Sequence, residues 1–215
     1  AATTPTVFVT VEAALRQAAA LCRGESLLLP AAAGGVGLAA AQVAAALGAE
    51  VVATAGSPAK RALLRRQGIR HVANSRDLTF AEEVVTATGG RGVCVVLNSL
   101  TSPGMVGASL SAVSRGGRWV EIGKRDIWSA ARVSGERPDV RYGLLAVDFM
   151  PAAVLHAGLS AVSAGLASGS LRPLPAAVHS LSSVAAALRQ MSQARHVGKV
   201  VVSAAAGPLA HGAAA

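Results

Sequence analysis

The segment AAGGVG at residues 32–37 combines small side chains with a spacing that could bind phosphate. It has the AxGxxG form, follows the apolar run Ser26–Ala31 and precedes the helical run Leu38–Leu47. Small residues let the backbone turn tightly, and the free N–H groups at a helix start attract the charge of a pyrophosphate. Because a strand precedes the turn and a helix follows it, the segment predicts a dinucleotide site and not only a turn that needs glycine.

The next apolar run, residues 50–55, is followed by cations and by no acid. A site that prefers NAD usually has Asp or Glu at this place, where it accepts hydrogen bonds from the ribose 2′-hydroxyl. No acid occurs at residues 51–76, whereas Lys60, Arg61 and Arg76 are available. These cations would attract a 2′-phosphate, so the cofactor is expected to be NADP(H). The alternative is a solvated basic helix face, which is the favoured interpretation for Arg65 and Arg66.

Short apolar runs alternate with helical runs before residue 150, which is typical of buried parallel strands joined by helices. The expected strands are Ser26–Ala31, Glu50–Ala55, His71–Asn74, Val93–Leu97 and Arg118–Ile122, with Val140–Leu145 as a candidate sixth. The expected helices are Thr10–Leu21, Leu38–Leu47, Pro58 to about Gly68 after the N-cap Ser57, Phe80 to about Thr88 after the capping box Thr79–Glu82, and Pro103–Ser114. The sequence therefore predicts an α/β fold with a doubly wound parallel sheet, a Rossmann domain with right-handed crossovers.

The chain is expected to have four parts. Residues 1–24 form an entry helix, and residues 25–150 form the dinucleotide-binding domain. Residues 151–203 supply an Ala-rich helix, the Pro-punctuated segment LRPLP, a second helix through Met191 and a return strand, Lys199–Ser203. Residues 204–215 have the composition of a linker tail. The chain has no initiator Met and both ends are rich in alanine, so it is expected to be a piece of a longer protein.

Composition excludes several classes of protein. With 52% apolar and 3% aromatic residues, the chain should fold around a core of small aliphatic side chains. Its net charge of +9 comes from scattered basic residues without a base-stacking pattern, which argues against nucleic-acid binding. Pro30 and the glycines break the uncharged stretch 26–49, so no membrane span is expected. Cys22 and Cys94 lack metal-ligand spacing, which predicts no metal site and favours a reduced, cytoplasmic compartment.

Five strings in order carry a family resemblance: the glycine turn with its flanks, HVANSRDLTF, ATGGRGVCVVLNSL, RGGRWVEIGKRDI and MSQARHVGKVVVS. Together they resemble the enoyl reductase domain of type I polyketide synthases and animal-type fatty acid synthases, which are zinc-free medium-chain dehydrogenases/reductases. The resemblance runs in register from about Pro5 to Ser203. It implies NADPH-dependent reduction of a trans-2-enoyl thioester carried on the phosphopantetheine arm of an acyl carrier protein.

The resemblance also assigns residues to the cofactor. The residues implied at the pyrophosphate are Gly34, Gly35, Val36 and Gly37. Those implied around the 2′-phosphate are Ser57, Lys60 and Arg76. Those implied along the ribose and nicotinamide crevice are Asn98, Ser99, Leu100, Ile122 and Gly123, which follow two successive strands. Ligands of doubly wound folds bind at the carboxyl ends of strands, in agreement with this placement.

A catalytic role for Lys124 and Asp148 is implied in the same way. Hydride delivered to the β-carbon creates a thioester enolate, which needs a nearby cation and then a proton on the α-carbon. Lys124 could supply both, and Asp148 would orient it and balance its charge. The alternative is that the two residues form an ordinary salt bridge or do not meet. The turn Gln193–His196 is expected to be structural.

Several positions depart from the family pattern. Pro30, Cys94 and Glu12 stand where the family usually has His, Asp and Tyr. Nothing corresponds to the N-terminal GroES-like substrate domain, in which the return strand would pair, so its hydrophobic edge is expected to stay open. The expected partners are the acyl carrier protein and neighbouring synthase domains, including that substrate half. The alternatives are a truncated, non-catalytic NADPH-binding or structural domain, and a stand-alone quinone-reductase-like enzyme.

Overall fold

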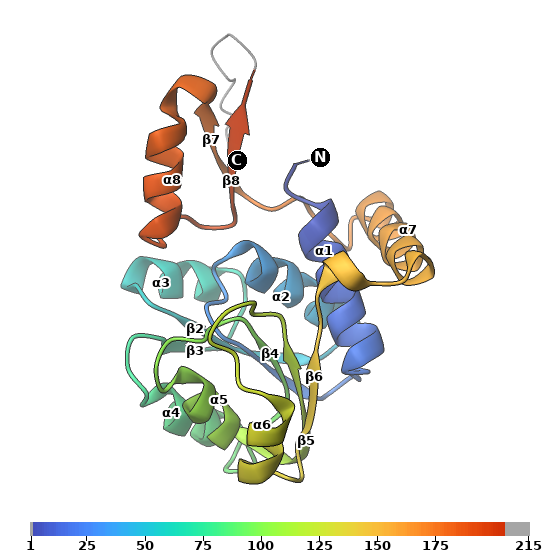
Figure 1. The fold of residues 1–215 in the computed structure, drawn as a ribbon, viewed down its shortest axis with the longest axis vertical. Helices are drawn as coiled ribbons and strands as arrows, with labels where there is room; N and C mark the ends of the chain where they lie inside the picture. The colour runs from blue at the N-terminus through green and yellow to red at the C-terminus, as the bar shows by residue number, and fades with distance from the viewer. Residues whose placement is uncertain (1, 205–215) are drawn as a thin grey trace.

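Six parallel strands form the central sheet in the order β3-β2-β1-β4-β5-β6 (Figure 1). The computed structural model describes residues 2–204. The strands are β1 Ser26–Leu29, β2 Glu50–Ala55, β3 His71–Asn74, β4 Val93–Asn98, β5 Val113–Glu121 and β6 Arg141–Leu144. Strands β1, β2 and β4 are mostly buried, as expected for continuous apolar runs with helices on both faces. The predicted doubly wound sheet and its candidate sixth strand are confirmed.

Helices cover both faces of the sheet (Figure 1). Around the cluster that contains Phe8 and Leu64 lie α1 Pro5–Glu12, the π-helix η1 Ala13–Ala18, α2 Gly35–Leu47, α3 Pro58–Arg66 and α7 Ala152–Ser168. Around the cluster that contains Trp119 lie α4 Phe80–Ala87, α5 Met105–Ser111 and α6 Ala130–Glu136. Most other buried side chains are Ala, Val and Leu, so small aliphatic residues build both cores as the composition predicts.

Several element boundaries differ from the sequence prediction; β5, for example, begins at Val113 and not at Arg118. The entry helix begins at Pro5 and turns into a π-helix, whose backbone leaves the helix where Ala20 takes a φ of 47°. Helix α5 begins only after Gly104, which has a φ of 80°, and it ends early because Val113 already pairs with β4. Strand β1 ends at Leu29, since the chain turns immediately afterwards.

The predicted capping box at the start of α4 is wrong. Thr79 has helical backbone angles and makes no side-chain cap to the helix. Its hydroxyl donates to the Asp77 carboxylate, and its backbone N–H donates to the same carboxylate at 3.1 Å. These local hydrogen bonds satisfy the Thr79 groups that a capping box would have used. Asp77 is therefore the polar side chain that organises this helix start.

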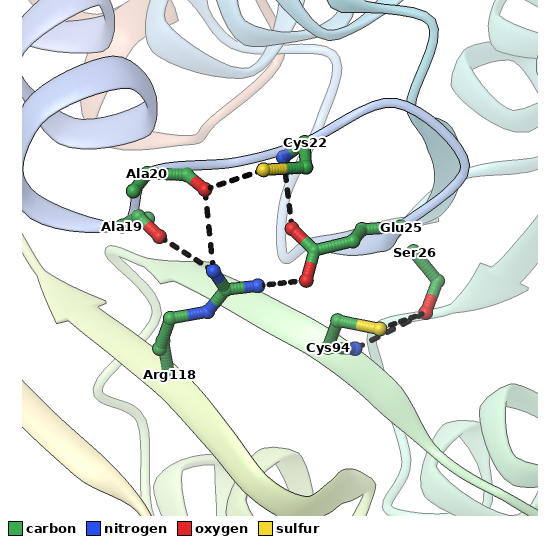
Figure 2. A network of polar contacts seen from close by, with 7 residues as sticks. All are labelled: Ala19, Ala20, Cys22, Glu25, Ser26, Cys94 and Arg118. Carbon is green, nitrogen blue, oxygen red and sulfur yellow. Dashed lines mark hydrogen bonds and ion pairs between the residues drawn. The ribbon is translucent and has the colours of Figure 1, made fainter.

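A half-buried network joins the entry helix to the amino-terminal part of the sheet (Figure 2). The Arg118 guanidinium, on β5, donates to the carbonyls of Ala19 at 2.8 Å and Ala20 at 3.2 Å, and to the Glu25 carboxylate. Glu25 also accepts the backbone N–H of Cys22 at 2.8 Å. One side chain thus satisfies the carbonyls exposed where the helix ends, including that of the left-handed Ala20.

Replacement of Arg118 by alanine is expected to lower the free energy of unfolding by about 2 kcal/mol, because two carbonyls lose this donor and the half-buried Glu25 carboxylate loses its cation. Urea unfolding monitored by circular dichroism measures this effect. The matched control is Arg115→Ala, since Arg115 is exposed in the same strand and should change stability by less than about 0.5 kcal/mol. Equal stability of both variants would contradict the proposed structural role.

The C-terminal residues form a small unit of their own above α2 and α3 (Figure 1). It consists of β7 Ala176–Ser180, the 3₁₀ turn η3 Leu181–Ser183, α8 Val184–Ser192 and β8 Lys199–Ser203. The return strand β8 pairs in parallel with β7 over its whole length. The sequence analysis missed β7, which follows the Pro-punctuated segment and covers one edge of β8, while the described residues supply no strand for the other edge.

Two other expectations concern the ends of the chain and the membrane. The expected linker tail, residues 204–215, lies outside the described residues apart from Ala204. Among the described residues, none of the helices has the length and apolar character needed to cross a bilayer.

Candidate functional site

The turn between β1 and α2 is shaped by a neighbouring strand. Ala31 takes a φ of 55°, and its N–H donates to the Thr54 hydroxyl at 3.2 Å. The N–H of Ala32 donates to the Thr54 carbonyl at 2.9 Å, and Gly34 closes the turn on the Ala31 carbonyl at 3.1 Å. Thr54 is buried in β2. Its role was missed because nothing in the spacing of the sequence links it to the glycine turn.

The start of α2 leaves backbone donors free for an anion. Gly34 is the N-cap residue and provides no side-chain cap. The first amides of a helix have no intrahelical acceptor, so they can donate to a bound phosphate. A Cβ on Gly37 would lie 2.4 Å from the Cα and the carbonyl oxygen of Ala32, which makes glycine the residue that fits there. A Cβ on Gly35 would lie 2.8 Å from the Cδ of Lys199, so β8 closely approaches this turn.

A cavity of about 940 Å³ lies at the carboxyl ends of β1, β2, β3 and β4. Four residues expected at the cofactor line it: Ser57, Lys60, Arg76 and Leu100. The cavity is also lined by Ala31, Ala33, Ala55, Gly56, Ser75, Ser102, Pro103, Met105, Gln193, Ala194 and Arg195. The cations that the sequence assigned to the 2′-phosphate therefore share a cavity with Ala33 of the glycine turn, whereas Gly34, Gly35, Val36 and Gly37 are not among its lining residues.

Lys60 and Arg76 both line this cavity, and within the described part of the chain none of its lining residues is acidic. Burial, and then the positive charge of Arg76, hold the pKa of Lys60 below its ordinary value. The Lys60 ammonium donates to the Ala194 carbonyl at 2.6 Å. A Cβ on Gly56 would lie 2.6 Å from Nε of Arg76, so this glycine makes room for the guanidinium. Two neighbouring cations that repel each other form a favourable place for an anion.

The other basic residues of α3 have different surroundings. The Arg61 guanidinium donates to the Ala55 carbonyl and to Oδ1 of Asn74, both at 3.1 Å. Arg65 donates to the Val72 carbonyl at 2.9 Å. Arg61, which the sequence offered as a phosphate ligand, thus braces the ends of β2 and β3. Arg65 and Arg66 are both exposed, as expected of a solvated helix face, and Arg65 in addition contacts the backbone of β3.

Of the residues expected along the nicotinamide crevice, one is buried and the others are exposed or half-buried. Asn98 is fully buried, and its Nδ2 donates to Oε2 of Glu121 at 2.7 Å, so its side chain does not line the cavity. Ser99 is exposed and Leu100 is half-buried. Ile122 and Gly123 are half-buried at the end of β5. The sequence placed all five residues at strand ends but did not predict that Asn98 points inward.

Lys124 and Asp148 meet at the carboxyl ends of the last two strands of the sheet. Lys124 follows β5, and Asp148 lies in the 3₁₀ turn η2 Val147–Phe149 that follows β6. The Lys124 ammonium donates to Oδ2 of Asp148, and the two side chains are 70% and 55% exposed. An ion pair this exposed contributes little to stability, so its charges stay available to a ligand. The catalytic role of the pair stays a prediction.

Arg195 was missed as a candidate site residue. The turn that carries it was expected to be structural, yet residues 193–195 line the cavity with Lys60 and Arg76. The backbone explains this approach, because the N–H of Gly198 donates to the Ala33 carbonyl at 2.9 Å and Gly198 bridges Gly34. The start of β8 is thereby fixed on the phosphate-binding turn. The only sequence signal was a basic residue just before the return strand.

Residues 2–204 contain no group of three or more His, Cys, Asp or Glu side chains that could hold a metal ion. A family model described as zinc-binding dehydrogenase nevertheless matches residues 35–137. The match covers the βα units that follow the glycine turn, and it therefore concerns the nucleotide-binding fold.

Relatives of known sequence and structure agree on the family. The mycocerosic acid synthase-like polyketide synthase of Mycolicibacterium smegmatis is 44% identical over 202 residues, which make up 91% of this chain and 9% of that protein. The crystal structure of CurK enoyl reductase matches with a TM-score of 0.88 and 44% identity, over 94% of this chain and 61% of that one.

A third relative is matched almost completely. The X-ray structure of the nucleotide-binding subdomain of the enoylreductase domain of PpsC from Mycobacterium tuberculosis matches with a TM-score of 0.69 and 31% identity, over 79% of this chain and 97% of that one. The present chain thus spans less than a tenth of the synthase and most of a nucleotide-binding subdomain. The chain belongs to the enoyl reductase domains of polyketide synthases, a branch of the medium-chain dehydrogenase/reductase oxidoreductases.

Proposed function

We propose that this chain binds NADPH and supplies its hydride for the reduction of a trans-2-enoyl thioester on an acyl carrier protein. The observation that carries the cofactor proposal is the convergence of Lys60 and Arg76 on one cavity that Ala33 of the glycine turn also lines. A pyrophosphate would lie against the free amides of α2, and a 2′-phosphate would lie between the two cations. The nicotinamide would then reach the ends of β4 and β5.

The residues of the site fit NADPH in three respects. Gly37 permits the close approach of the helix to the turn, Gly56 leaves room for the Arg76 guanidinium, and no acid competes for the cations at residues 51–76. NADPH would supply a hydride when bound. The chain itself would orient the cofactor. The Lys124 ammonium would stabilise the negative charge of the developing enolate and donate a proton to the α-carbon. Asp148 would hold the Lys124 ammonium in place through their hydrogen bond.

Replacement of Lys60 by alanine tests the cofactor proposal. The variant should weaken NADPH binding about tenfold to a hundredfold and leave NADH binding unchanged, because a charge-assisted hydrogen bond to the 2′-phosphate is lost. The measurement is a titration of nicotinamide fluorescence with each cofactor. The matched control is Arg66→Ala on the same helix, because Arg66 is exposed and does not line the cavity. Equal affinity of the unsubstituted chain for NADH and NADPH would contradict the assignment.

Two alternative functions are distinguished by adding an enoyl thioester or a quinone to the NADPH-bound chain and following NADPH oxidation. A non-catalytic nucleotide-binding domain of a synthase would bind NADPH without oxidising it in the presence of an enoyl thioester. A quinone-reductase-like enzyme is favoured by the structural match to a Pseudomonas syringae quinone oxidoreductase, with a TM-score of 0.80 and 27% identity. Such an enzyme would oxidise NADPH with a quinone and not with the thioester.

The partners follow from the family. The relatives are multidomain polyketide synthases, so we propose that the chain works beside other synthase domains and receives its substrate on an acyl carrier protein. The C-terminal unit exposes apolar side chains, among them Leu181, Leu188 and Met191. We propose that a substrate-binding half of the reductase covers this surface. The four-part division of the chain stays a prediction of the same kind.

A further inference from the structure

Glu121 is a buried carboxylate at the end of β5 that forms no ion pair with another described residue. Its exposed fraction is 0%, and none of the ion pairs within residues 2–204 includes it. Burying a carboxylate is unfavourable unless hydrogen bonds replace its water. Packing of the hydrophobic core therefore does not explain why a carboxylate occupies this buried position.

Three donors replace the water around Glu121. Oε2 accepts Nδ2 of Asn98 at 2.7 Å and Nε1 of Trp119 at 3.3 Å, while Oε1 accepts the backbone N–H of Gly123 at 2.7 Å. Both oxygens are therefore used. The charge of Glu121 also reaches Tyr142 on β6, since burial and then this charge raise the pKa of Tyr142 to about 12.

These contacts connect two loops that follow neighbouring strands. Asn98 is the direct cross-strand partner of Glu121, and its Oδ1 accepts the N–H of Leu100 at 3.3 Å. Leu100 lines the cavity proposed for the cofactor. On the other side, the Gly123 N–H fixes the start of the loop that carries Lys124. The hydrogen-bond chain from Leu100 through Asn98 and Glu121 to Gly123 spans both loops.

The chain of hydrogen bonds is specific for a carboxylate at residue 121. A glutamine there has one acceptor oxygen, so its amide group would face a donor, either Asn98 and Trp119 or Gly123. The loop after β5 has little room to adjust, because a Cβ on Gly123 would lie 2.7 Å from Oε1 of Glu121 and 3.1 Å from Ile127. A change of charge without a change of size should therefore move a loop.

We propose that Glu121 is a positioning residue, which holds the loops after β4 and β5 in the arrangement that the nicotinamide half of NADPH requires. The inference rests on the proposed function, because it assigns these loops to that half of the cofactor. The adenosine half lies against Lys60 and Arg76, which Glu121 does not contact. The two halves of the cofactor should therefore respond differently to a change at Glu121.

The experiment compares two ligands on the Glu121→Gln variant of the full chain. Isothermal titration with NADPH should show about a tenfold loss of affinity, whereas titration with adenosine 2′,5′-bisphosphate should change less than about twofold. The matched control is Glu83→Gln, an exposed carboxylate on α4, which should affect neither ligand. A second variant, Glu121→Gln with Asn98→Asp, exchanges the carboxylate and the amide, and it should recover most of the NADPH affinity.

Each outcome decides between positioning and a structural role. Equal weakening of both ligands, or no weakening of either, would overturn the inference and leave the proposed function standing. If Glu121→Gln fails to fold, the exchanged variant decides, because positioning requires it to keep the NADPH-to-bisphosphate affinity ratio of the unsubstituted chain. An unsubstituted chain that binds neither ligand would overturn the proposed function and the inference together.

Discussion

Replacement of Lys124 by alanine is expected to slow the reduction of a trans-2-enoyl thioester about a hundredfold or more. The variant loses both the cation that would stabilise the enolate and the proton donor for the α-carbon. Its NADPH affinity should stay within about twofold, because Lys124 lies outside the cavity that holds the other cations. Its stability should also be preserved, since the Lys124 side chain is 70% exposed.

The measurement is the rate of NADPH oxidation by the full-length protein with an enoyl thioester as substrate. Arg125→Ala is the matched control, because Arg125 is the exposed neighbour of Lys124 and has no assigned role. Asp148→Asn should slow the reaction by a smaller factor, about tenfold, since it would only release the Lys124 ammonium from its partner. Unchanged turnover in Lys124→Ala would identify the Lys124–Asp148 contact as an ordinary surface ion pair.

Replacement of Gly37 by alanine is expected to destabilise the protein and to abolish measurable NADPH binding. The new Cβ would lie 2.4 Å from the Cα and carbonyl oxygen of Ala32, and neither backbone atom can move without opening the turn. Overpacking of this kind destabilises by roughly 1–3 kcal/mol. Because the displaced turn carries the amides proposed for the pyrophosphate, affinity should fall by more than the loss of stability alone explains.

Urea unfolding and a fluorescence titration with NADPH measure the two effects of Gly37→Ala. Gly135→Ala is the matched control, because Gly135 also lies in a helix and a Cβ there would meet no atom within 4 Å. That variant should gain up to about 1 kcal/mol from the higher helix propensity of alanine. A Gly37→Ala protein with unchanged NADPH affinity would show that the turn does not bind the cofactor.

Local patterns in the sequence were sufficient for the sheet and for the general place of the site. Buried parallel strands, glycine turns and helix starts are determined by neighbouring residues, because hydrogen bonding and apolar burial repeat at short spacing along the chain. These patterns placed the turn at 32–37 and the cations Lys60 and Arg76 at strand ends, whereas the pair Lys124 and Asp148 came from the family resemblance. They failed at Thr79, where a hydrogen bond to Asp77 replaced the expected cap.

The tertiary structure alone decided which of these side chains face the cavity. The Asn98 side chain points inward and donates to Glu121, and the Arg61 guanidinium donates its hydrogen bonds to Ala55 and Asn74. Arg195 reaches the cavity on a turn whose Ala194 carbonyl binds Lys60, a residue 134 positions earlier. Such contacts depend on how distant segments pack, and no spacing within one segment encodes them. The sequence by itself therefore determined the fold and the chemistry available, whereas packing selected the residues that can meet a ligand.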